Sequence, residues 1–207
     1  MRTSLINLKS RPPRPVARPC PGGLVLTLCL LLLAAPLFAE SYYLAPDRPD
    51  GIALLTPPPE AGSAEEAADL ASARAIFKGR TPAEAARAAK DSSLSIFLFT
   101  PAIGPFFAPG KLPKTEALFK KVKKDIAEPL DKAKDHWQRR RPYQLDEQLS
   151  LGKPEPSYGY PSGHSTRGTV QALLLAELFP AQKAAILEIG RNIGWDRVLI
   201  GIGRAHV

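Results

Sequence analysis

The residues Pro161, Ser162, Gly163 and His164 stand directly before a run of apolar residues with helical spacing. Proline and glycine favour a tight turn, and serine is a preferred residue at a helix N-cap. The first backbone N–H groups of a helix have no partner within it, so such a start is a ready binding site for anions. A bound dianion would also stabilise the imidazolium of His164 and make it a proton donor. The alternative is structural, with Ser162 as a simple cap and His164 as an ordinary polar residue.

Lys134 and Arg141 form a second candidate group for binding an anion. They are seven residues apart, two helical turns, so both side chains would point the same way if the helix continued to Pro142. The planar guanidinium of arginine suits two oxygens of a phosphate, and lysine adds a compact positive charge. The alternative is a basic helix end that complements the helix dipole.

Arg197 is the third candidate, because it interrupts an apolar stripe on a predicted helix. The stripe is formed by Ile186, Ile189, Ile193 and Ile200. A buried guanidinium is costly unless a carboxylate or another anion meets it. The adjacent Asp196 points elsewhere on a helix and is a poor partner, whereas a bound phosphate would serve. The alternative is an arginine at the edge of the core that reaches solvent.

The elements that must position these residues are helices. Ser63 with Glu66 and Thr81 with Glu84 have the spacing of capping boxes. We expect helices over residues 63–80, 81–93, 114–138, 162–178 and 181–200. A buried apolar run, 94–107, is broken by Pro101 and Pro105, and a long loop covers 143–160. Since no stretch alternates in the manner of a strand, the sequence predicts an all-α domain over residues 63–207.

The residues before this domain predict export. Residues 1–39 hold five of the 28 basic residues and none of the 20 acidic ones. Their apolar run, Leu24–Ala39, is short for a membrane span, so we interpret residues 1–39 as a signal peptide, with an uncleaved anchor as the alternative. Both cysteines lie in this leader, so the exported part has no disulfide. Residues 40–62 include five prolines and are predicted to be an extended arm that packs on the domain.

The charge of the chain argues against nucleic acid as a partner. The formal net charge is +8, but residues 40–207 carry 23 basic and 20 acidic side chains. Proteins that bind a phosphate backbone concentrate positive charge on the folded domain. We also expect no stable membrane span once the leader is removed. The sequence does not decide whether identical subunits associate into a homo-oligomer.

Together the three groups resemble the type 2 phosphatidic acid phosphatase and vanadium haloperoxidase superfamily. The shared pattern is Lys-x6-Arg-Pro, then Pro-Ser-Gly-His, then an arginine on a later helix. Here 18 residues separate Pro142 from Pro161, and 32 separate His164 from Arg197. Residues 42–71 resemble the entry segment of the bacterial class A nonspecific acid phosphatases, which are exported.

This resemblance implies a helical bundle of the acid phosphatase type and a periplasmic or secreted phosphomonoesterase. It would act on small phosphomonoesters through a phosphohistidine, without a metal or other cofactor, and would also bind inorganic phosphate. His164 would be the general acid that protonates the leaving alcohol. The phosphate-binding residues would be Lys134, Arg141, Ser162, Gly163 and Arg197.

The sequence departs from the family pattern after Arg197. The nucleophilic histidine of the family is expected six residues later, where this chain has Gly203, and its orienting aspartate four residues after that. His206 is three residues late, and without an orienting carboxylate it is a poor substitute. We therefore expect a truncated or frame-changed chain with an incomplete bundle and impaired catalysis. The alternatives are an inactive phosphate-binding remnant and, less favoured by the entry segment, a vanadium-dependent haloperoxidase.

Overall fold

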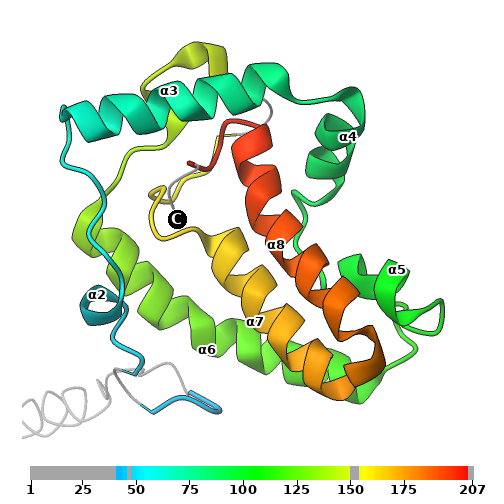
Figure 1. Ribbon diagram of the computed structural model, residues 1–207. Coiled ribbons are helices and arrows are strands. Elements are labelled where there is room, and N and C mark those ends of the chain that lie inside the picture. The colour runs from blue at the N-terminus through cyan, green and yellow to red at the C-terminus, as the bar shows by residue number, and fades with distance from the viewer. Residues whose placement is uncertain (1–40, 46–47, 150–153, 205–207) are drawn as a thin grey trace, which may run out of the picture. The chain divides into compact units, whose positions relative to one another are not determined.

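The computed structural model describes residues 41–45, 48–149 and 154–204, which are helical throughout their regular parts and contain no strand (Figure 1). The all-α prediction is therefore confirmed for this part of the chain. The α-helices are α2 (Gly51–Leu54), α3 (Ala64–Gly79), α4 (Pro82–Lys90), α5 (Thr100–Ile103), α6 (Pro113–Trp137), α7 (Gly163–Leu178) and α8 (Lys183–Leu199). Four 3-10 turns accompany them: η1 (Ile96–Phe99), η2 (Pro142–Gln144), η3 (Glu147–Leu149) and η4 (Pro180–Gln182). The predicted leader and His206 lie outside the described residues.

The helix starts follow the local sequence closely. At α4 the predicted capping box forms in full, since Thr81 Oγ1 accepts from the Glu84 amide and the Glu84 carboxylate accepts from the Thr81 amide. At α3 Ser63 Oγ accepts from the Glu66 amide as expected. The Glu66 carboxylate, however, accepts from the amide of Gly62 rather than from that of Ser63. Both caps satisfy donors that the helix itself leaves without a partner.

Helices α7 and α8 form an antiparallel pair in close contact (Figure 1). Small residues face each other along the contact: a Cβ at Gly190 would lie 2.5 Å from the Cβ of Ala172. A Cβ at Gly168 would likewise lie 2.9 Å from Cγ2 of Ile193. The close approach needs glycine at both positions, and it fixes the start of α7 relative to the end of α8.

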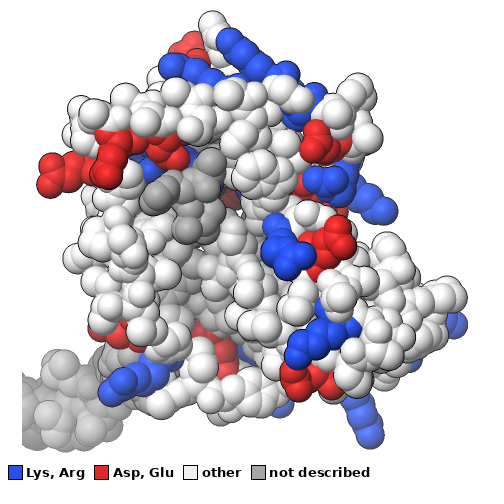
Figure 2. Space-filling model, in the orientation of Figure 1, with Lys and Arg blue, Asp and Glu red and all other residues white. Residues whose placement is uncertain are grey.

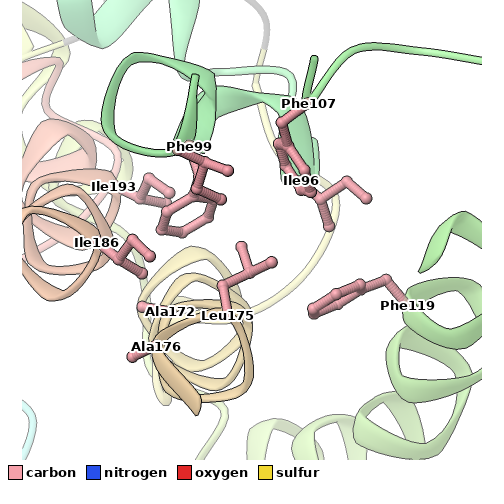
Figure 3. Packing of buried hydrophobic residues seen from close by; sticks show 10 residues of the cluster. Ile96, Phe99, Phe107, Phe119, Ala172, Leu175, Ala176, Ile186 and Ile193 are labelled. Atoms are coloured by element: carbon pink, nitrogen blue, oxygen red, sulfur yellow. The ribbon is translucent and has the colours of Figure 1, made fainter. Parts of the chain in front are cut away.

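The main hydrophobic core lies between this pair and the segment that carries η1 and α5. Four side chains pack together there, and each is 0% exposed: Phe99, Leu175, Ile186 and Ile193 (Figure 3). The apolar run is divided at its prolines as predicted, since η1 ends at Phe99 and α5 ends before Pro105. Pro101 lies in the first turn of α5, where its missing N–H costs nothing.

The arm before α3 lies along α6. The carboxylate of Asp125 on α6 accepts from the backbone amides of Tyr42 and Tyr43, at 2.8 and 2.6 Å. Farther on, the hydroxyl of Tyr160 donates to the carbonyl of Thr56. Helix α2 was not expected from the sequence, and its N-cap Asp50 accepts from two backbone amides. Between α2, α6 and α7 lies an apolar cavity of about 580 Å³.

Helix α6 ends at Trp137, close to the end at residue 138 that the sequence predicted. Its C-cap Gln138 has φ 46°, a left-handed conformation, and donates its N–H to the carbonyl of Lys134. The helix therefore does not continue to Pro142, and the condition under which Lys134 and Arg141 would share one helix face is not met. A left-handed C-cap turns the chain away from the helix axis, so Arg141 approaches Lys134 from a separate segment.

None of the helices within the described ranges combines the length and the apolar character that crossing a membrane requires. Lys, Arg, Asp and Glu are interspersed over the face drawn in Figure 2.

Candidate functional site

The predicted site residues meet around one small cavity of about 90 Å³. The cavity lies where the end of α6, the loop before α7, the start of α7 and the end of α8 come together. The predicted residues in its wall are Lys134, Arg141, Ser162, Gly163, His164 and Arg197. Three motifs that are far apart in sequence thus converge, as the resemblance requires, although their roles stay predictions.

Three buried cations give the cavity its charge. Lys134, Arg141 and Arg197 are 4%, 9% and 4% exposed. Burial, and then the positive charge of Arg141, lowers the pKa of Lys134 to about 8. Burial also lowers the pKa of both arginines. Because the charged forms lose hydration without full compensation, an anion in the cavity would relieve their cost.

Backbone carbonyls orient the first two cations. Arg141 donates from Nε to the carbonyl of Ser157 at 2.8 Å and from Nη1 to that of Ile202 at 3.1 Å. The carbonyl of Tyr158 accepts both from Arg141 Nη2 and from Lys134 Nζ. Arg141 therefore joins the loop before α7 to the segment after α8.

Arg197 has a carboxylate partner that the sequence analysis missed. Its Nη2 lies 2.7 Å from Oε1 of Glu155. The adjacent Asp196 is fully buried and pairs instead with Arg87 of α4, at 2.7 Å, so the expectation that Asp196 is not the partner is confirmed. Glu155 lies within the predicted loop, and no local pattern places a loop residue against a helix 42 residues later.

His164 lies in the first turn of α7, half-buried in the wall of the cavity. Ser162 caps this helix by accepting from the amide of Ser165 at 3.2 Å. The Nε2 atom of His164 is 3.3 Å from the carbonyl oxygen of Ser92. Burial, and then the charge of Arg197, lowers the pKa of His164 to about 4. The imidazole is therefore neutral at pH 7 while the cavity holds no anion, and a bound dianion would raise its pKa.

Two further residues of the wall were missed as binding residues. Arg167 follows His164 by three residues, so both lie on one face of α7, and this spacing was a signal that could have been used. The charge of Arg167 lowers the pKa of both His164 and Lys134. Gly203, at the position expected for the nucleophile, also lines the cavity. A Cβ there would lie 3.1 Å from the Cβ of Arg197.

A buried network of ion pairs holds the segment that carries Gly203. Arg204 donates to Asp69 at 2.9 Å and pairs with Glu66 at 3.2 Å, both on α3. Asp69 also accepts from Arg139, at 2.6 Å. Since all four side chains are buried, the network fixes the chain after α8 against α3.

Comparisons with known proteins place these features in context. No family model matches the chain. It is 33% identical over 162 residues to an acid phosphatase of Zymomonas mobilis subsp. mobilis, a match that covers 73% of this chain and 61% of the relative. It is 30% identical over 176 residues to a non-specific acid phosphatase of Providencia stuartii, covering 78% of this chain and 70% of the relative. The chain thus spans about two thirds of the length of these curated relatives.

Among solved structures, the chain is similar to a transmembrane PAP2-type phosphatidylglycerolphosphate phosphatase from Bacillus subtilis. The sequence identity is 22% and the TM-score is 0.45, over 70% of this chain and 77% of the other.

Proposed function

The chain belongs to the bacterial class A acid phosphatases of the type 2 phosphatidic acid phosphatase superfamily, and from this premise we propose that its cavity binds and hydrolyses phosphomonoesters. The observation that carries the proposal is the burial of Lys134, Arg141 and Arg197 around one helix start. Buried cations that lack full compensation fit a ligand with several anionic oxygens.

The phosphoryl group would bind with its oxygens toward the cations and the start of α7. The guanidinium groups of Arg141 and Arg197 and the ammonium group of Lys134 offer positive charge to these oxygens. The backbone N–H of Gly163 and the hydroxyl of Ser162 would serve the remaining oxygen. Donors fixed in advance in this way stabilise the negative charge that spreads over the phosphoryl oxygens in the transition state.

His164 would act as the general acid. When the bond between phosphorus and the leaving oxygen breaks, the imidazolium of His164 gives its proton to that oxygen and becomes neutral. A bound phosphate dianion raises the pKa of this imidazole from its value of about 4 in the empty site. Hydrolysis should therefore be fastest under acidic conditions, where the complex carries a protonated His164.

A second candidate function is phosphate binding without turnover, and Gly203 favours it. Transfer through a phosphohistidine needs an imidazole in line with the leaving oxygen. Gly203 lines the cavity at the expected position of that imidazole and offers no nucleophile.

The two candidates are separated by measuring hydrolysis of p-nitrophenyl phosphate and calorimetric binding of inorganic phosphate on the same 207-residue chain. Turnover that is lost in Arg197→Met and His164→Gln, but kept in the exposed control Arg191→Met, supports the phosphatase. Loss of this turnover in His206→Ala would assign the nucleophile to His206.

Phosphate binding without turnover supports the second candidate. If the chain neither binds phosphate nor hydrolyses the ester, both candidate functions are excluded. Bromide oxidation that depends on added vanadate, without ester hydrolysis, would replace them with a haloperoxidase.

We also propose that the chain is exported to the periplasm or beyond. The support is the sequence of residues 1–39, with basic residues first and an apolar run after them. The mass and N-terminal sequence of the protein recovered from a periplasmic fraction test this: recovery only in the cytoplasm contradicts it.

A further inference from the structure

Among the described residues, Glu155 is one of two carboxylates in the wall of the cavity, the other being Asp131, and four cations line the same wall: Lys134, Arg141, Arg167 and Arg197. Its Oε1 atom lies 2.7 Å from Nη2 of Arg197. The side chain of Arg197 is 5% exposed, whereas that of Glu155 is 34% exposed. The carboxylate therefore keeps contact with solvent while it pairs with a buried guanidinium.

The charge of Glu155 acts on the whole site and not only on Arg197. Its negative charge raises the pKa of the three buried cations, against the effect of burial: Lys134, Arg141 and Arg197. The same charge favours the protonated form of His164 and so raises its pKa. Glu155 thus supplies part of the compensation that a bound anion would provide to these cations.

The backbone of Glu155 is held separately from its side chain. The hydroxyl of Tyr143 accepts from the Glu155 amide and donates to the Glu155 carbonyl, both at 3.1 Å. Pro154 and Pro156 on either side restrict the backbone further. Rotation about the side-chain bonds can therefore move the carboxylate while the loop keeps its place.

We propose that Glu155 is an internal ligand of the site, which an incoming phosphoryl group must displace from Arg197. The proposal rests on the proposed function, that the cavity binds phosphoryl groups. A carboxylate presents two oxygens to a guanidinium much as a phosphoryl group does, so the two compete for the same donors. They also repel each other, because both are negatively charged at neutral pH.

Displacement makes Glu155 a specificity-determining residue. A phosphate dianion offers more charge and more acceptor oxygens than the carboxylate that it replaces, and it can engage Lys134 and Arg141 as well. A singly charged anion such as nitrate gains little over the carboxylate and should not displace it. Glu155 thus excludes weak anions from the site at the expense of some affinity for phosphate.

The test is the Glu155→Gln variant of the full chain, with binding of phosphate and of nitrate measured by calorimetry at pH 7. Glutamine keeps an oxygen that accepts from Arg197 but removes the charge. We expect phosphate to bind about ten- to a hundredfold more tightly, the ordinary range for losing a competing charged hydrogen bond. Nitrate should bind measurably to the variant only. The matched control is Glu147→Gln, an exposed carboxylate on η3, which should leave both affinities unchanged.

The failure of this inference is distinguishable from that of the proposed function. Phosphate binding that is equal in the wild type and Glu155→Gln, or weaker in the variant, overturns the role of Glu155 and leaves the site in place. Absence of phosphate binding in both chains overturns the site and the inference together. Should Glu155→Gln not fold, Glu155→Asp withdraws the carboxylate by one methylene, and tighter phosphate binding is again the expected result.

Discussion

Lys134→Met should stabilise the empty protein while it weakens phosphate binding. Methionine has a length similar to that of lysine and suits an irregular apolar space, but it carries no charge. Lys134 is 4% exposed, and no carboxylate pairs with it directly in the described part of the chain. The substitution therefore removes a buried charge that the empty site compensates poorly.

The size of the effect follows from the pKa of Lys134, which falls from 10.5 to about 8 on folding. The unfolded chain binds more protons between these two values, so stability rises with pH across that window. The cost of the charged lysine, about 3 kcal/mol, is thus fully present below pH 8 and disappears above about pH 10.5. Methionine avoids this cost but loses the hydrogen bond to Tyr158, worth about 1–2 kcal/mol. We expect a net gain of about 1–2 kcal/mol at pH 7.

Urea unfolding at pH 7, with and without phosphate, measures both consequences. Phosphate at a hundred times its dissociation constant should stabilise the wild type by about 2.7 kcal/mol, and Lys134→Met far less. The control is Lys123→Met, an exposed position on the same helix, which should change neither value. The reasoning is refuted if Lys134→Met is less stable than the wild type without phosphate, or if phosphate stabilises both equally.

Three other predictions concern His164, Arg204 and the apolar cavity. In proton NMR the imidazole of His164 should titrate with a pKa of about 4, and phosphate should raise it. Because the folded pKa lies below the unfolded value, this group adds stability that is complete above about pH 6.5 and is lost as the pH falls through 4. Arg204→Met should cost about 3 kcal/mol in urea unfolding, since it leaves Asp69 and Glu66 buried with fewer partners. Val170→Phe should partly fill the cavity of about 580 Å³, raise stability by about 1 kcal/mol and weaken binding of an apolar fluorescent dye.

Each of these has its own control and opposing outcome. The His164 signal is identified by its absence in His164→Gln, and a pKa that phosphate leaves unchanged would place the anion elsewhere. Arg191→Met, an exposed arginine on α8, is the control for Arg204, and equal stability of the two variants would show that the network contributes little. Dye binding that Val170→Phe does not alter would contradict an accessible apolar cavity at α7.

The sequence predicted those features that depend on neighbouring residues. Capping at Ser63 and Thr81 is decided within one helical turn, and both helices begin where the sequence indicated. The start of α7 at Ser162 is of the same kind. These predictions succeed because the competing conformations of a few residues are decided by their own hydrogen bonds.

Lys134 and Arg141 come together, but not through the shared helix face that their spacing would allow. The seven-residue spacing assumed one continuous helix, but Gln138 ends α6 in a left-handed conformation. Both side chains nevertheless reach the carbonyl of Tyr158, because the chain turns back toward the end of the helix. A left-handed residue other than glycine gives little warning in the sequence.

The pairing of charged residues could not be predicted. Arg87 pairs with Asp196, which is 109 residues away in the sequence, and Glu155 pairs with Arg197, which is 42 residues away. Such pairs are decided by how whole helices pack, and a sequence with many arginines and carboxylates allows many pairings. The sequence left open whether Arg197 is buried or reaches solvent, and it gave no indication of its partner.

The ion pairs on α3 connect the first part of the domain to the cavity, although α3 contributes no residue to the wall of that cavity. Asp69 anchors Arg204, and two residues earlier the carbonyl of Ile202 steadies the guanidinium of Arg141. Substitutions at Asp69 should therefore make the position of Arg141 less well defined. They should reduce the affinity for phosphate although Asp69 does not line the cavity. A fragment that began at α4 would keep every residue of the wall and still lose the support that sets their spacing.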